Sequence, residues 1–481
     1  MATKKQKTVT TTPKKPWWNL AIKFVVVVLV ATAVVVFTDV KGYFEPDQKN
    51  NHTLKKWDAF YDFTKTDTID VLLIGNSHCY AGVNPKNLSA ALGANCFILA
   101  SPGTSIMDSY YCLKEGLKKT TPKVVIIETY GISNTENHLL SGQALSDQFK
   151  SFESRKAVGL KLGSMPRLFS GENYIPAWSK TIRNHDFLFH DQKQLQTNLQ
   201  LMKQHKKKKK ELYLGRFVSF TTGMADTTLA KYDTQGPTVD GDLFEVNKEN
   251  TRYTNKIIKL CRKKGITPVF VTIPMYYKHI QHYDTWKERL SAVIEPTGAA
   301  WLDLQQPYDT LLFDPDCFEN TVKNNQHTTY VGSLRCTYKI AHFLVDSLHI
   351  NLPKRDQTTH WHDMFYGQEG YFENYPSRKA DEKNVLLGKN LRYNGLTILD
   401  GIQKKGDKHS TLLMKVQKEP GVTPPKTLHV YALVSINGEV ITTRFDLQRL
   451  IDYDPLRHDV YGIFLLPDAQ VLEISMENPV R

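Results

Sequence analysis

Short apolar runs alternate with amphipathic segments through the middle of the chain. Five runs have the length and composition of buried strands, at residues 69–74, 96–99, 124–127, 268–273 and 299–302. Helical periodicity predicts helices at residues 85–92, 106–118, 254–264, 286–294 and 331–348. Strands that are apolar on both sides need cover on both faces. The pattern therefore predicts an α/β fold, a flavodoxin-like three-layer sandwich with a mostly parallel sheet.

Two regions depart from this alternation. Residues 135–246 are polar and lack clear strands, so we interpret them as a partly helical insertion in a domain that spans 66–350. The region 355–481 has short strand patterns, at residues 396–399, 411–416, 427–435, 440–445, 460–466 and 471–475. Asn437-Gly438 lies between two of these patterns and is a strong hairpin signal. A small antiparallel β domain is predicted at the C-terminus.

An apolar stretch near the N-terminus, residues 17–38, is long enough to cross a hydrocarbon core of about 30 Å. Trp17-Trp18 suits the lipid interface, and the basic tail 1–16 favours a cytoplasmic N-terminus. We expect a transmembrane anchor, a stalk at 39–65 and a folded part outside the cytoplasm. A cleaved secretion signal is the alternative, because Ala31-Thr32-Ala33 has the small-x-small pattern of a cleavage site.

The formal net charge of +13 is concentrated in two places. Lysines within residues 1–44 and the run 203–210 account for almost all of it, so the remainder is nearly neutral. A general polyanion-binding surface is not indicated, and no nucleic-acid partner is expected. We interpret the lysine run as a solvated face or loop.

Six cysteines are an even number, and an oxidising compartment leaves both disulfides and buried thiols open. None has C-x-x-C spacing, which argues against a zinc ribbon. His360 and His362 have a metal-like H-x-H spacing but no further clustered ligands. No metal and no cofactor are expected.

Candidate catalytic residues follow the predicted strands at their carboxyl ends, where open parallel sheets bind ligands. Ser77 follows the first strand, Gly103 the second and Asn134 the third, and His327 follows the fifth. A histidine can take the proton of a serine hydroxyl, and backbone N–H groups can hold the oxyanion that forms. This edge of the sheet is therefore predicted to be a serine-dependent site.

Three segments resemble the sequence blocks of the SGNH (GDSL-type) hydrolases. Residues 69–85, reading IDVLLIGNSHCYAGVNP, are similar to the first block, in which Ser77 would be the nucleophile. Residues 100–103 resemble the second block, whose Gly103 N–H would help to form the oxyanion hole with the Ser77 N–H. Residues 324–332, reading NNQHTTYVG, resemble the last block, in which His327 would be the base. The resemblance covers about residues 66–348.

Departures from the family pattern leave the acid and one oxyanion donor open. Asn324 stands where the resemblance places the acid, and an amide can orient an imidazole without supplying charge. Asp314, Asp316 and Glu319 are the alternative acids. The third block is imperfect, so Asn134 as an oxyanion donor is an expectation from position alone. We interpret Glu128 and Tyr130 as packing and salt-bridge residues.

The closest resemblance is to the membrane-anchored branch that contains the teichoic-acid D-alanylation protein and the alginate acetylation proteins. That branch shares an N-terminal anchor and a run like residues 122–128, PKVVIIE. It implies an extracytoplasmic serine esterase or O-acyltransferase, most simply for acetyl groups, acting on a cell-envelope or exported polysaccharide. Implied partners are the acylated glycan, the bilayer and a multi-pass membrane O-acyltransferase. A catalytically weak binding or assembly protein of the same fold is the alternative.

Overall fold

The computed structural model describes most of the chain, and everything below concerns these residues alone. They are 17–45, 52–133, 142–203, 214–216, 223–309, 312–323, 326–355, 382–384, 386–388, 391–404, 410–436, 438–451, 458–465 and 468–477. The chain forms two compact units. Residues 1–51 and 171–209 make up the first unit, and residues 52–170 and 210–481 make up the second.

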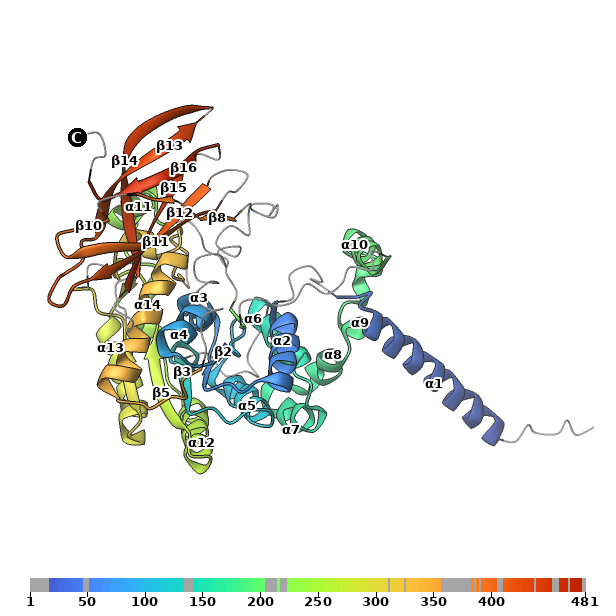
Figure 1. The fold of residues 1–481 in the computed structure, drawn as a ribbon. Helices are drawn as coiled ribbons and strands as arrows, with labels where there is room; N and C mark the ends of the chain where they lie inside the picture. The colour runs from blue at the N-terminus through green and yellow to red at the C-terminus, as the bar shows by residue number, and fades with distance from the viewer. Residues whose placement is uncertain are drawn as a thin grey trace, which may run out of the picture. The chain divides into compact units, whose positions relative to one another are not determined.

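The first unit contains the apolar N-terminal helix α1 (Trp17–Lys41), which is long and apolar enough to cross a membrane. None of its residues is buried. The rest of this unit comes from the middle of the predicted insertion and forms short helices around the C-terminal end of α1 (Figure 1). These are η3 (Gly171–Asn173), α8 (Tyr174–Trp178), α9 (Lys180–Arg183), η4 (His185–Leu188) and α10 (Gln192–Lys203).

The second unit is built on a five-stranded parallel sheet, as predicted. Its strands are β1 (Val71–Ile74), β2 (Cys96–Ile98), β3 (Val124–Glu128), β5 (Thr267–Thr272) and β7 (Ala300–Asp303). The order β2-β1-β3-β5-β7 places the first strand between the second and the third. All four neighbouring pairs are parallel. This strand order is the flavodoxin-like arrangement, so the predicted fold class is confirmed.

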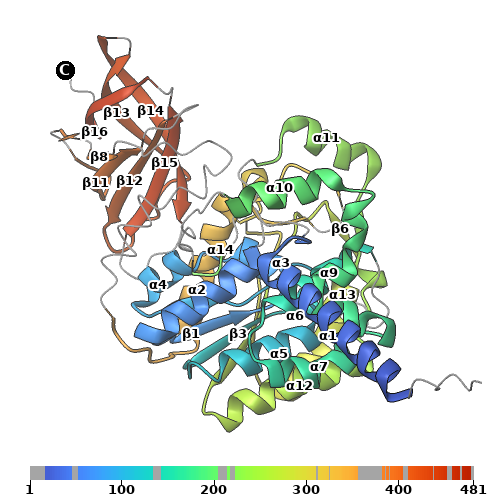
Figure 2. The ribbon, with the colours of Figure 1, turned by 90° about the vertical axis from the view of Figure 1, so that its right-hand side faces the viewer.

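Helices cover both faces of this sheet (Figure 2). On one face, Val71, Leu73 and their neighbours on β2, β3 and β5 pack with α4 (Pro85–Leu92) and α14 (Tyr330–His342). Successive strand residues alternate between faces, so Leu72 points the other way, toward α5 (Ile106–Gly116). Such two-sided burial explains why these strands have no polar alternation in sequence.

Local sequence explains where the helices of this unit begin and end. The Asn84 side chain caps α4 by accepting from the Lys86 and Asn87 N–H groups, and Gly93 ends it in a left-handed conformation. The other α-helices are α2 (His52–Thr66), α3 (Ser77–Gly82), α6 (Gly142–Ser154), α7 (Val158–Leu168), α11 (Asp226–Gln235), α12 (Lys248–Lys263) and α13 (Tyr283–Ile294). Short elements are β4 (Val239–Asp240), β6 (Ile280–Gln281), η1 (Tyr130–Ser133), η5 (Gly241–Leu243), η6 (Glu295–Thr297), η7 (Pro315–Cys317) and the π-helix η8 (Phe343–Ser347).

The C-terminal region is a nine-stranded, almost wholly antiparallel sheet, in agreement with the predicted β domain. Its strands are β8 (Glu382–Asn384), β9 (Leu386–Leu387), β10 (Arg392–Tyr393), β11 (Leu396–Lys404), β12 (Ser410–Lys418), β13 (Thr427–Ile436), β14 (Glu439–Ile451), β15 (His458–Leu465) and β16 (Gln470–Ser475). Ile436 pairs with Glu439 across the predicted hairpin turn, where Gly438 has a φ of 86°. A hydrophobic cluster that includes Leu412, Val430 and Tyr461 forms the core of this sheet.

The sequence left open whether the six cysteines form disulfides or are buried thiols. Cys79, Cys96, Cys112, Cys261, Cys317 and Cys336 are all buried thiols. The His360-x-His362 motif lies outside the described residues.

Candidate active site

Ser77 occupies a tight turn between the central strand β1 and helix α3. It is the first residue of α3, and its exposed fraction is only 6%. The preceding Asn76 caps the helix, because its side-chain oxygen accepts from the His78 N–H at 2.9 Å. The sequence Gly-Asn-Ser-His thus ends a buried strand and begins a helix within three residues. This turn places the serine at a helix N-terminus, where the first N–H groups have no partner within the helix.

Gly75 is required at this turn for a steric reason. It has a φ of 151°, and a Cβ atom there would lie 2.6 Å from the Cβ of Glu128 on neighbouring β3. The glycine allows the buried Glu128 side chain to lie against the turn. The carboxylate accepts from the Tyr130 N–H at 2.7 Å. Burial raises the pKa of Glu128 to about 8, against the opposing effect of the Tyr130, Asn76 and Thr129 N–H groups.

His327 has a carboxylate partner, and that partner is Glu319. Phe318 and Thr328 form a β-bridge, which brings the neighbouring residues Glu319 and His327 face to face. Glu319 Oε1 accepts from the His327 backbone N–H at 2.9 Å and lies 3.3 Å from Nδ1 of its ring. Both side chains are about nine-tenths buried, so water screens the pair only weakly.

The loop that carries His327 packs on helix α3, which begins at Ser77. The His327 and His78 ring centroids are 5.0 Å apart. The hydroxyl of the next residue, Thr328, donates to the Ala81 carbonyl of α3 at 3.2 Å. Two segments separated by some 250 residues therefore meet at the carboxyl edge of the sheet, with the imidazole beside the residue that follows the serine.

The Gly103 loop lies beside the serine turn. The Ser101 N–H donates to the Gly75 carbonyl at 3.3 Å, which joins the loops that follow β1 and β2. Gly103 has a φ of 58°, and a Cβ atom at this position would lie 3.4 Å from the Asp147 side chain of α6. The geometry thus brings Gly103 to the edge that carries Ser77. Asn134, the third predicted oxyanion donor, lies outside the described residues.

The candidate acids differ in which side chains they contact. Asp314 forms an ion pair with Lys426. Asn324 and the side chain of Asp316 lie outside the described residues. Glu319 is the one of the three alternative carboxylates that the described side chains place against His327.

Sequence reasoning missed several polar residues near this edge. The interpretation of Tyr130 as a packing residue left out that it stacks on His78, with the ring centroids 4.3 Å apart. Nδ1 of the buried His279 lies 2.7 Å from the Tyr232 hydroxyl. Burial and the charge of His327 lower the pKa of His279 to about 4. Lys56 of α2 is almost fully buried, where it binds the Ala100 carbonyl. These residues come from separate elements, and no sequence motif links them to Ser77.

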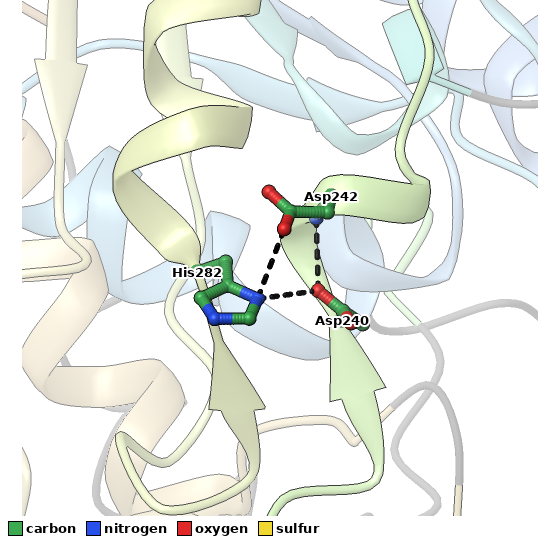
Figure 3. Close-up of side chains that lie close together, drawn as sticks. All are labelled: Asp240, Asp242 and His282. Carbon is green, nitrogen blue, oxygen red and sulfur yellow. Dashed lines mark hydrogen bonds and ion pairs between the residues drawn. The ribbon is translucent and has the colours of Figure 1, made fainter.

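Asp240, Asp242 and His282 form a side-chain cluster with metal-like composition on β4, η5 and the loop after β6 (Figure 3). His282 Nδ1 lies 3.0 Å from Asp240 Oδ1 and 3.2 Å from Asp242 Oδ2. The hydrogen bond that the imidazole donates to Asp240, together with the charge of Asp242, raises the pKa of His282. An imidazole must lose its proton to bind a metal, so a metal at this cluster would compete with that proton.

Comparison with known proteins gave no relative by sequence. No protein-family model matches the chain, and no curated protein matches it. Several solved structures resemble it weakly, among them the following three. A two-domain esterase active on acetylated mannans is 9% identical, with a TM-score of 0.26 over 87% of this chain and 94% of that one. A gut microbial diltiazem-metabolizing enzyme is 12% identical, with a TM-score of 0.21 over 79% and 71%. Alanine racemase from Acinetobacter baumannii is 10% identical, with a TM-score of 0.16 over 88% of each chain. At these scores the likenesses carry no argument about the chemistry of this chain.

Proposed function

We propose that this protein is a membrane-anchored serine esterase or O-acyltransferase of SGNH type that acts outside the cytoplasm. The observation that carries the proposal is the buried pair of Glu319 and His327. The His327 ring centroid lies 5.0 Å from that of His78, the residue that follows Ser77 in the chain. A carboxylate, an imidazole and a serine on one edge of a parallel sheet are the parts that acyl transfer by a serine requires.

The proposed reaction begins with attack by the Ser77 hydroxyl oxygen on the acyl carbonyl. Glu319 contacts Nδ1 of His327, so Nε2 is the nitrogen that takes the serine proton. The Ser77 and Gly103 N–H groups are the proposed donors to the oxyanion. His327 then gives its proton to the leaving alcohol, and the acyl group stays on Ser77 as an ester.

The second half of the reaction releases the acyl group. His327 removes a proton from the acceptor, whose oxygen attacks the acyl-serine ester and regenerates the Ser77 hydroxyl. Water as acceptor makes the protein an esterase, whereas a sugar hydroxyl makes it an acyltransferase. Helix α1 and the resemblance to the envelope-modifying branch support a cell-envelope or exported polysaccharide as the substrate class, with acetyl as the group transferred.

The binding-protein alternative rests on the amide at Asn324. Glu319 weakens that support, because a carboxylate from another position already faces the imidazole. A multi-pass membrane O-acyltransferase as partner and glycan binding by the C-terminal sheet are parts of the proposal that rest on the resemblance and on the compartment.

Hydrolysis of an activated acetyl ester by the full-length chain in detergent tests the proposal. Ser77→Ala should abolish turnover, while Ser291→Ala, at a serine on α13, should leave it unchanged. Circular dichroism of both variants checks that they fold. Wild-type turnover in the Ser77→Ala protein would show that this serine is not the nucleophile.

A further inference from the structure

The module formed by residues 171–203 is fixed to the C-terminal end of helix α1. Asp39 Oδ1 accepts from both the backbone N–H and the hydroxyl of Thr181, each at 2.7 Å. The hydroxyls of Thr38 and Thr181 are 2.8 Å apart. Helix α9 is thus joined to the last turn of the apolar helix by three side-chain contacts.

Further contacts hold the module to the segment that follows α1. The Asn198 amide donates to the carbonyls of Tyr43 and Glu45, each at 2.8 Å, and the Asn198 side chain is fully buried. The Asn184 amide donates to the Phe44 carbonyl at 2.8 Å. An ion pair joins Lys180 to Glu45. Residues 171–203 therefore form a defined cap on the end of the helix.

This cap exposes large apolar side chains. Ile175 is 62% exposed, Ile182 41%, Leu188 45% and Phe189 74%. They lie on α8, α9 and η4 and just beyond it. Helix α9 lies at the end of α1 (Figure 1). On α1 itself, Val40 is 79% exposed, so the apolar surface of the helix continues up to the cap. A soluble surface rarely gathers this many apolar side chains without a partner.

We propose that residues 174–189 lie in the interface of the bilayer that α1 crosses and contact lipid directly. Aromatic and aliphatic side chains at the end of a membrane span are favoured at the headgroup level, where short helices lie in the plane of the membrane. The chain continues from α10 into the lysine run 203–210, whose composition suits anionic headgroups. The cap then holds the exit point of the anchor at a fixed depth.

The contacts favour lipid over a protein partner. α8 and α9 are only five and four residues long, too short to present a helical face or a groove to a partner helix. The cap is also continuous with α1, none of whose residues is buried.

Spin labels on the full-length chain in nanodiscs that contain phosphatidylglycerol test this inference. Ile175→Cys and Phe189→Cys carry the label. Val30→Cys is the membrane reference, and Gln196→Cys, at an exposed position of α10, is the aqueous control. The native cysteines are buried, so the wild-type chain gives the labelling background. The measurement is the collision rate of each label with oxygen and with a water-soluble nickel chelate.

Lipid contact predicts that labels at 175 and 189 collide more with oxygen than with nickel, as at residue 30, whereas residue 196 shows the reverse. Aqueous behaviour at 175 and 189, equal to that at 196, would overturn the proposal. Low collision rates with both reagents would also overturn it, because they would mean burial against protein. Each label alone carries the test, so failure of one variant to fold leaves the other.

Discussion

Replacing Glu128 by glutamine should make the second unit more stable at alkaline pH. The carboxyl group lies buried under the serine turn, where burial raises its pKa to about 8 from an ordinary value of 4.5. Glutamine keeps the shape and the oxygen that accepts from the Tyr130 N–H, but it cannot ionise. The substitution therefore removes the charge and leaves the packing of the turn in place.

The direction of this pH dependence follows from which state of the protein holds the Glu128 proton. Between the unfolded and the folded pKa, the folded protein keeps the Glu128 proton that the unfolded chain has released. The contribution of Glu128 to the stability of the wild type should therefore be fully present below about pH 4.5 and be lost as the pH rises through about 8. At 1.36 kcal/mol for each tenfold difference in acidity, the full loss is about 5 kcal/mol, an order-of-magnitude figure.

Urea unfolding of the full-length chain in detergent at pH 5, 7 and 9 measures this loss. Fluorescence of the buried Trp57 and Trp286 reports on the α/β part. The difference between wild type and Glu128→Gln cancels the other titrations, including that of His279. Glu249→Gln removes a carboxylate from the exposed pair with Arg252 and should follow the wild type within about 0.5 kcal/mol. Parallel pH dependence in wild type and Glu128→Gln would refute the reasoning.

Three further predictions concern the acid, the turn and the anchor. Glu319→Gln should slow ester hydrolysis by at least about 100-fold, because replacing the carboxylate of a Ser-His-Asp protease by an amide costs about 10⁴ in kcat. Asn324→Asp should change the rate little. Equal rates in wild type and Glu319→Gln would contradict this prediction. Gly75→Ala should lower stability by about 1–3 kcal/mol in urea unfolding, because its Cβ meets that of Glu128, and an unchanged midpoint would count against the steric argument. A C-terminal reporter active only outside the cytoplasm should be active and the full-length chain should survive a carbonate wash, whereas a soluble form starting near Val34 would show a cleaved signal.

The fold was predictable from sequence because its signals are local. Five apolar runs bounded by turns became the five strands, and β1 occupies the last four residues of the predicted 69–74 run. The helix predicted at 331–348 is α14 followed by η8, so its length was right, although its last turn is a π-helix. The faces that a strand or helix buries are set by the spacing of apolar residues along that same segment. Apolar periodicity therefore predicts these elements.

The site was only partly predictable, because its contacts depend on how the chain folds back on itself and not on a residue pattern. The motif order pointed to Ser77, Gly103 and His327 at one edge, but the acid remained open among several residues. Glu319 faces the imidazole because the β-bridge between Phe318 and Thr328 folds the chain back on itself. No residue pattern in the sequence predicts that bridge. The buried position of Lys56 likewise depends on the loop after β2, far along the chain.

Phosphonylation of the full-length chain by a fluorophosphonate, followed over time by intact mass, tests the central claim most directly. The claim is that Glu319 and His327 activate Ser77. It predicts a single adduct on the Ser77 peptide in the wild type, none in Ser77→Ala, and labelling at least about 100-fold slower in both His327→Ala and Glu319→Gln. No adduct on the wild type, or equal rates in wild type, His327→Ala and Glu319→Gln, would contradict the account.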